Sequence, residues 1–186
     1  MGERGDDTSA WEIRFKESNP VTIMIGPPIN PELDPIVVDK LVQSRGIKVV
    51  CDGTTSQIVS SHTGEQLTVT LNYENPGIPP AADIKGIDLV TEGVLTIGKT
   101  LDMLKRFPYM DRSEKVIALS KKDAASRLVR ILLEESTEVR FLVGRAINPA
   151  HQNPEMPISL GLKLNLIKEM KAELEKIGKI VNIEYF

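Results

Sequence analysis

The chain has a single cysteine, Cys51, among its 186 residues, so it cannot form an internal disulfide. It also lacks an apolar run of membrane-spanning length and a segment typical of a signal peptide. We therefore expect a cytoplasmic protein that does not enter a membrane.

An excess of positive charge is missing as well. The chain has 23 Lys and Arg residues against 26 Asp and Glu residues, for a net charge of −3, and its basic residues are spread along the sequence. A nucleic-acid surface needs a basic stripe that contacts many phosphates. We expect no nucleic acid among the partners of this chain.

Two similar segments of eleven residues are the most useful internal pattern. Val21–Pro31 aligns without gaps on Val139–Pro149, with five identical positions. Each segment is an apolar strand that ends at a glycine, Gly26 or Gly144, and continues into an Ile-Asn-Pro loop, a helix and a second strand. Either the chain holds two pseudo-repeated strand-loop-helix-strand halves related by a pseudo-twofold axis, or chance produced the matches, since this pattern is common.

The sequence indicates three helices besides the one that follows Cys51. One has Asp34 as its N-cap, Pro35 at its first position and Gly46 as its stop. A second runs from about residue 157 to residue 177, where leucines and a methionine recur every four residues. A third follows Asp88 as N-cap and buries Leu89, Val90, Val94, Leu95, Ile97 and Leu101.

Short apolar runs predict strands at 21–25, 47–51, 67–71, 116–119, 139–143 and 180–185. Because helices separate most of these runs, they predict an α/β fold with a mixed, mainly parallel sheet flanked by helices.

The loop after the strand 47–51 is a candidate ligand site. Asp52, Gly53, Thr54 and Thr55 open a predicted helix there. A glycine that permits close approach, two hydroxyls and a helix N-terminus together suit phosphate or carboxylate. The alternative is that one of the threonines only caps the helix.

The two Ile-Asn-Pro loops are a second candidate, because ligands of open α/β sheets bind at the carboxyl ends of the strands. Asn30 and Asn148 supply amide groups, and Arg145 supplies a guanidinium where the first copy has Pro27. Alternatively, Asn-Pro simply forms the turn before each helix.

Glu92 is the third candidate, since we expect it among the apolar neighbours of the predicted third helix. A carboxylate there needs a partner: the amides of residues 53–55, a ligand, or a basic residue inside the fold. Cys51 is predicted to be a small core residue, because His62, its nearest histidine in sequence, lies at the far end of the following helix.

The N-terminal residues carry one further pattern. Gly5-Asp6-Asp7-Thr8-Ser9 precedes the run Ala10–Phe15, in which Trp11, Ile13 and Phe15 share one face of a predicted strand. The two carboxylates form either a solvated turn or part of a site for Mg²⁺ or Mn²⁺, which prefer oxygen ligands.

This motif resembles the closing metal motif of PPM-type serine/threonine phosphatases of the SpoIIE-like bacterial branch. The segments Val21–Pro31, Cys51–Thr55 and Gly86–Gly93 resemble a region that follows the catalytic domain in some of these proteins. The resemblance implies that Asp6 is a ligand of Mg or Mn in the parent phosphatase, although Ser9 stands where the family has threonine. The other acidic ligands of the family lie upstream, so we expect neither phosphatase activity nor a cofactor for this chain alone.

The resemblance also divides the chain. Residues 1–16 are expected to be the terminal strand of an upstream metal-dependent phosphatase domain, and residues 17–186 an α/β accessory domain. We expect this domain to be regulatory or ligand-sensing, with the phosphatase domain and a small anionic ligand as partners. The alternatives are a structural or homodimerisation module without a ligand, and an independent small-molecule enzyme that uses Asp52, Asp88 or Glu92.

Overall fold

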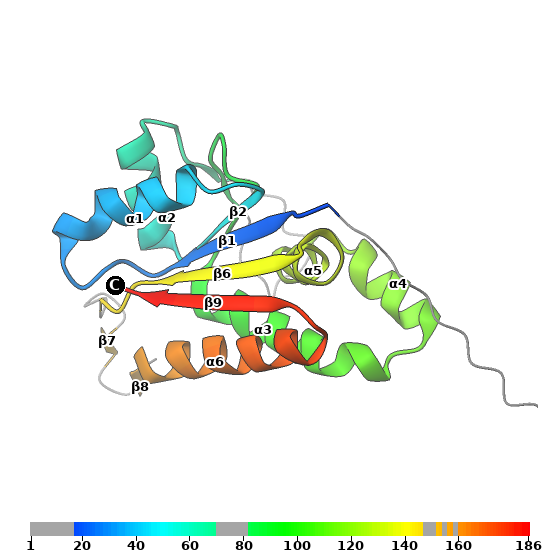
Figure 1. Ribbon diagram of the computed structural model, residues 1–186. Helices are drawn as coiled ribbons and strands as arrows, with labels where there is room; N and C mark the ends of the chain where they lie inside the picture. The colour runs from blue at the N-terminus through cyan, green and yellow to red at the C-terminus, as the bar shows by residue number, and fades with distance from the viewer. Residues whose placement is uncertain (1–16, 70–81, 147–151, 154–155, 158–159) are drawn as a thin grey trace, which may run out of the picture.

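The computed structural model describes residues 17–69, 82–146, 152–153, 156–157 and 160–186. Its centre is a seven-stranded sheet of order β3-β4-β5-β2-β1-β6-β9 (Figure 1). Five neighbouring strands are parallel, and β4 is antiparallel to both of its neighbours. The strands are β1 (Pro20–Ile25), β2 (Ile47–Cys51), β3 (Thr68–Val69), β4 (Ala82–Asp83), β5 (Leu89–Thr91), β6 (Glu138–Val143) and β9 (Ile180–Tyr185). The predicted mixed, mainly parallel α/β sheet is confirmed.

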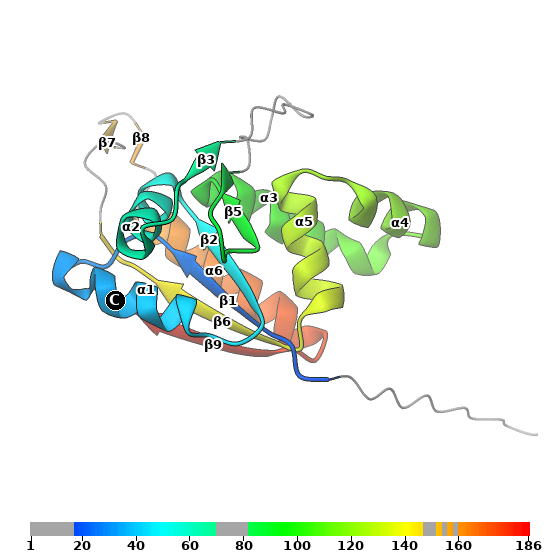
Figure 2. The ribbon, with the colours of Figure 1, turned by 90° about the horizontal axis from the view of Figure 1, so that it is seen from above.

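Helices cover both faces of the sheet (Figures 1 and 2). One face carries α1 (Asp34–Val42) and α2 (Gly53–Thr63). The other carries α3 (Gly93–Arg106), α5 (Ala124–Arg130), its π-helical continuation η3 (Ile131–Glu135) and α6 (Leu160–Lys176). The remaining elements are η1 (Pro31–Leu33), η2 (Phe107–Tyr109), α4 (Arg112–Ser120) and the small hairpin of β7 (Gln152–Asn153) and β8 (Met156–Pro157). None of the helices in the described residues is both long and apolar enough to cross a membrane.

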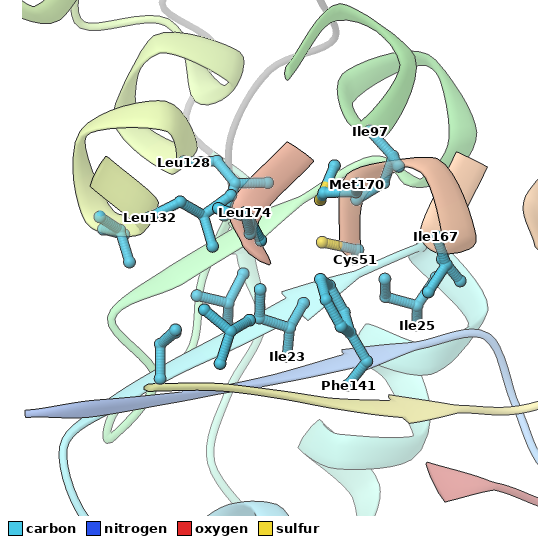
Figure 3. Packing of buried hydrophobic residues seen from close by; sticks show 14 of the residues in the cluster. Ile23, Ile25, Cys51, Ile97, Leu128, Leu132, Phe141, Ile167, Met170 and Leu174 are labelled. Atoms are coloured by element: carbon cyan, nitrogen blue, oxygen red, sulfur yellow. The ribbon is translucent and has the colours of Figure 1, made fainter. Parts of the chain in front are cut away.

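Two apolar layers hold these helices on the sheet. Strand β1 is buried from Val21 to Ile25, as expected of a central parallel strand that is covered on both faces. Ile23 and Ile25 pack with Phe141 of β6 against α3, α5 and α6 (Figure 3). Met24 points the other way, into the layer under α1 and α2.

The two similar segments lie side by side at the centre of the sheet. Strands β1 and β6 pair in parallel, and Val21 is opposite Val139 just as it is in the sequence alignment. From β1 the chain crosses through α1 to β2, and from β6 it crosses through α6 to β9 on the other side. Because α1 and α6 lie on opposite faces, the two halves have the arrangement that a pseudo-twofold axis would produce.

Two of the predicted elements are wrong. The run Val116–Leu119 belongs to α4, not to a strand. The carboxylate of Asp111 accepts a hydrogen bond from the backbone N–H of Glu114, and the Glu114 side chain accepts one from the Asp111 N–H. This capping box starts a helix immediately before the apolar run and outweighs its preference for a strand.

The helix predicted after Asp88 begins five residues later, at Gly93. The Asp88 carboxylate accepts a hydrogen bond from the N–H of Lys48 instead of capping a helix, and Leu89–Thr91 form β5 beside β2. A buried position next to β2 therefore decides the conformation of this segment. A smaller difference is that Asp34 is the first residue of α1, whose N-cap is Leu33.

Candidate functional site at the carboxyl edge of the sheet

The carboxyl ends of four parallel strands meet at one edge of the sheet. The first residue after each of these strands is Gly26 for β1, Asp52 for β2, Glu92 for β5 and Gly144 for β6. Connections leave β1 and β6 in opposite directions, so the order of strands reverses between these two neighbours. Ligands of open α/β sheets collect at such a reversal.

Glycines allow the two loops at this point to touch. A Cβ atom on Gly144 would stand well under 3.0 Å from the carbonyl oxygens of Gly26 and Pro27. The Gly144 N–H donates to the carbonyl of Ile25 at 2.9 Å, and the Ala146 N–H donates to the carbonyl of Pro27 at 3.1 Å. Glycine is therefore required at the end of the strand in each similar segment, because the backbones of the loops after β1 and β6 approach each other closely at Gly26 and Gly144.

The side chain of Lys163 reaches over this crossing from the first turns of α6. Its Nζ donates to the carbonyl oxygen of Gly144 at 2.6 Å, and a Cβ atom on Gly26 would overlap it. Burial lowers the pKa of the Lys163 ammonium, and the negative charge of Asp52 raises it in part. A half-buried cation thus lies above the switch point, where the charge of Asp52 acts on it.

Asp52 has an unusual backbone. Its φ of 111° is the one positive φ among the non-glycine residues that the structure describes. The Asp52 N–H donates to the carbonyl of Thr91, and its own carbonyl accepts from the N–H and the hydroxyl of Ser56. Such a conformation costs on the order of 1–3 kcal/mol, and residues that hold it cluster at functional sites.

With this backbone conformation, the side chain of Asp52 does not cap the N-terminus of α2. An aspartate before a helix normally accepts a hydrogen bond from a backbone amide of the first turn, but no such bond forms at the start of α2. Its Oδ2 accepts instead from the hydroxyl of Thr55 at 3.2 Å. On its other side lies Gly93, where an added Cβ would stand 3.8 Å from Oδ1.

The other residues of the predicted anion loop have different positions. Gly53 is exposed, and a Cβ atom there would have nothing within 4 Å. Thr54 is half-buried, whereas Thr55 is fully buried with its hydroxyl on Asp52. Gly53 and Thr54 are thus accessible to a ligand, whereas the hydroxyl of Thr55 donates a hydrogen bond to the carboxylate of Asp52.

The remaining predicted ligand residues are more scattered. Glu92 is exposed at the N-cap of α3, so the expectation that apolar neighbours surround it is wrong. The side chain of Asn30 accepts from the N–H of Glu32 and caps η1, as expected of an Asn-Pro turn. Arg145 is exposed beside the crossing. Asn148 and Asp6 lie outside the described residues.

The stretch Gly93–Thr100, GVLTIGKT, has the Gly-x-x-x-x-Gly-Lys-Thr spacing of a P-loop. A P-loop wraps its backbone amides around phosphate before the helix starts, whereas here the whole stretch lies inside α3. The Thr100 hydroxyl is buried and donates to the carbonyl of Thr96 at 2.8 Å. The sequence matches the P-loop pattern, but the helical conformation of this stretch does not suit phosphate binding by backbone amides.

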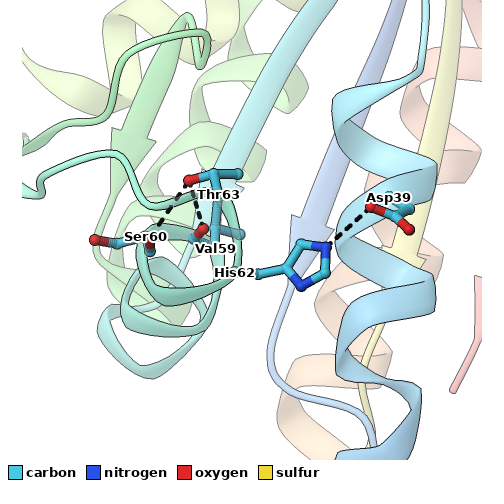
Figure 4. A network of polar contacts seen from close by, with 5 residues as sticks. All are labelled: Asp39, Val59, Ser60, His62 and Thr63. Atoms are coloured by element: carbon cyan, nitrogen blue, oxygen red, sulfur yellow. Dashed lines mark hydrogen bonds and ion pairs between the residues drawn. The ribbon is translucent and has the colours of Figure 1, made fainter.

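Cys51 and His62 do not form a reactive pair. Cys51 is buried in the core beside Met170 and Phe141 (Figure 3), and burial strongly raises the pKa of its thiol. His62, near the end of α2, contacts the Asp39 carboxylate of α1 at 2.9 Å (Figure 4). The prediction that Cys51 is a core residue is confirmed.

A pocket lined by residues of α3, η2, η3 and α6 contains none of the predicted ligand residues. Its two lysines already have acidic partners: Lys105 binds Glu169 at 2.6 Å and Lys176 binds Glu173 at 2.7 Å. The carboxyl edge, with a cation and a carboxylate that are not bonded to each other, is the stronger candidate site.

Lys163 is the residue that the sequence analysis missed. It lies in a helix with many lysines, and nothing in its spacing separates it from them. The repeated pattern is the usable signal in the sequence. It predicts that a helix follows the Gly144 loop at the point where the strand order reverses, and Lys163 lies in that helix.

Comparison of the chain with models of known protein families, with curated proteins and with solved structures finds no match. Within the described residues, no group of three or more His, Cys, Asp or Glu side chains is placed to hold a metal ion. Asp6, which the phosphatase resemblance implies as a ligand of Mg or Mn, lies outside the described residues.

Proposed function

We propose that residues 17–186 form a cytoplasmic accessory domain that binds a small anionic ligand at the carboxyl edge of its sheet. The ammonium of Lys163 carries this proposal. It is half-buried above the β1–β6 crossing, and among the described residues its one hydrogen-bond acceptor is the Gly144 carbonyl. An ammonium has three N–H donors, so two remain for a ligand.

The neighbouring loop supports an anion at the same edge. Gly53 starts α2 and leaves open space around its backbone, and the N-terminus of a helix carries a partial positive charge. Gly53 comes shortly after the end of β2, and the ammonium of Lys163 lies against Gly26, which follows the neighbouring strand β1. A carboxylate or phosphate between them would gain a charge-assisted hydrogen bond from Lys163.

The resemblance to the C-terminal region of SpoIIE-like phosphatases supplies the second half of the proposal. In such a protein, ligand binding to the accessory domain changes the activity of a metal-dependent catalytic domain, and the accessory domain has no catalytic role of its own. The relay predicts that, in a protein with both domains, deletion of residues 17–186 abolishes the response of phosphatase activity to the ligand. Activity that responds unchanged after the deletion would exclude it.

Binding itself is testable by thermal unfolding, because a ligand that prefers the native state raises the melting temperature. We expect phosphate or small carboxylates to stabilise the chain, and Lys163→Met to remove this effect. The matched control is Lys168→Met, which removes an exposed lysine from the same helix and should leave the shift intact. Equal shifts in both variants would show that Lys163 does not bind the anion.

A structural or dimerisation module is the second candidate. Strand β9 is the outermost strand at one side of the described sheet, and Ile180 and Tyr185 are 60% and 42% exposed. An open edge of this kind can pair with a second copy. Sedimentation of the unaltered chain and of Ile180→Lys tests it: a dimer that the substitution dissociates favours the module, and a monomer at all concentrations excludes it.

A further inference from the structure

The carboxyl edge presents two opposite charges, not one. The Nζ of Lys163 lies against Gly26, since a Cβ atom on Gly26 would overlap it. Gly26 follows Ile25 and Asp52 follows Cys51, and Ile25 and Cys51 are paired in the parallel register of β1 and β2. The two charged groups therefore lie at the ends of neighbouring strands, and the charge of Asp52 acts on the ammonium. Their hydrogen bonds nevertheless end on other groups, Lys163 on the Gly144 carbonyl and Asp52 on the Thr55 hydroxyl. The two side chains have no direct bond to each other, so both retain hydrogen-bonding capacity for a third group.

The free atoms of the pair differ in kind. Lys163 has N–H donors to spare, whereas the Oδ1 of Asp52 is an acceptor to which no residue in the described part of the chain donates. A simple anion that approached Lys163 would come near the negative charge of Asp52, and a simple cation at Asp52 would come near Lys163. Each single-charge ligand therefore meets repulsion at one end of the pair.

The backbone of Asp52 fixes the direction of its carboxylate. Four contacts hold the residue at its positive φ: the Thr91 carbonyl, the Ser56 N–H, the Ser56 hydroxyl and the Thr55 hydroxyl. The side chain thus stays at the edge between β5 and the Lys163 crossing, although the ordinary conformation would direct it to the amides of α2.

We infer that the ligand of this site carries an anionic group next to a hydrogen-bond donor, as α-amino acids and α-hydroxy acids do. Its carboxylate binds Lys163, and its ammonium or hydroxyl donates to Oδ1 of Asp52. This inference rests on the proposed anion site and specifies the class of its ligand.

The experiment compares three sets of probes on the unaltered chain by thermal shift and by titration. They are the common α-amino acids, the matching α-hydroxy acids, and the carboxylic acids with the same side chains but neither donor. We expect at least one amino or hydroxy acid to bind about tenfold or more tightly than its matching carboxylic acid, because a hydrogen bond to a charged group contributes at least that factor.

Two variants assign the preference to Asp52. Asp52→Asn keeps the shape of the side chain and suits a positive φ, and it should reduce the preference to within about twofold while carboxylic acids still bind. Asp102→Asn, on the exposed face of α3, is the control and should keep the full preference.

Three results would overturn the inference: no probe binds, the carboxylic acids bind as tightly as their amino and hydroxy counterparts, or Asp52→Asn retains the preference. The second result leaves the anion site intact if Lys163→Met still abolishes binding. Failure of the ligand class is therefore distinguishable from failure of the proposed site. The comparison on the unaltered chain also stands if Asp52→Asn does not fold.

Discussion

Replacement of Gly144 by alanine tests the close approach of the two loops at the centre of the site. The new Cβ would overlap the carbonyl oxygens of both Gly26 and Pro27. These atoms belong to the backbone and cannot rotate away, so the loops after β1 and β6 must separate. Two hydrogen bonds cross this point, from Gly144 to Ile25 and from Ala146 to Pro27.

The cost follows from these contacts. Loss of two backbone hydrogen bonds costs about 1–3 kcal/mol in total, and overpacking of a tight site adds about 1–3 kcal/mol. We therefore expect Gly144→Ala to lower the free energy of unfolding by about 2–6 kcal/mol, a large part of the stability of an ordinary domain. Urea unfolding followed by circular dichroism at equilibrium measures it.

Gly98→Ala is the matched control. Gly98 lies inside α3, and a Cβ atom there would have nothing within 4 Å. Alanine favours a helix over glycine by about 1 kcal/mol, so this variant should be more stable than the unaltered chain. The reasoning is refuted if Gly144→Ala costs less than about 1 kcal/mol, because the two loops would then not be in contact.

Three further substitutions test the core and the charges. Phe141→Ala should cost about 3–5 kcal/mol in urea unfolding, because Phe141 of β6 is fully buried in the apolar layer under α3, α5 and α6; a loss below about 1 kcal/mol would contradict the packing. The buried thiol of Cys51 keeps its proton in the folded state, so the stability of the unaltered chain relative to Cys51→Ala should fall as pH rises above 9.0 and the unfolded thiol ionises; a flat difference would contradict this. Burial lowers the pKa of Lys163, so the unfolded chain binds its proton more readily. The stability of the unaltered chain relative to Lys163→Met should therefore rise as pH approaches 10.5, and a flat difference between the two pH profiles would contradict this.

The central strands could be predicted because their burial leaves a direct trace in the sequence. Residues 21–25, 47–51 and 139–143 are apolar in nearly every position, since helices cover both faces of these strands. The repeat further indicated which two strands occupy equivalent places, and their pairing matches the alignment residue for residue.

Other elements depend on contacts that the sequence does not display. In the sequence, Leu89–Thr91 suit a helix, and pairing with β2 makes them a strand. Val116–Leu119 suit a strand, and the capping box upstream places them in a helix. Both errors concern short apolar runs, whose periodicity suits either conformation.

The candidate site was partly predictable. The loop Asp52–Thr55 follows a buried strand and contains a glycine, which is the usual signal for a ligand loop. The role of Lys163 depends on how α6 lies across the switch point, and the role of Asp52 depends on a backbone conformation that Thr91 and Ser56 impose. Neither role is visible in the sequence, because Lys163 contacts Gly144 and Asp52 contacts Thr91, and both partners are distant in sequence.

The most direct test of the anion site follows the backbone amides of the chain by NMR during titration with a small carboxylate. The account predicts that the largest shifts occur at Gly53, Gly93 and Gly144, which surround the Lys163–Asp52 pair, and that Lys163→Met removes them. Shifts confined to other parts of the chain, or equal shifts in Lys163→Met, would contradict a ligand site at the carboxyl edge.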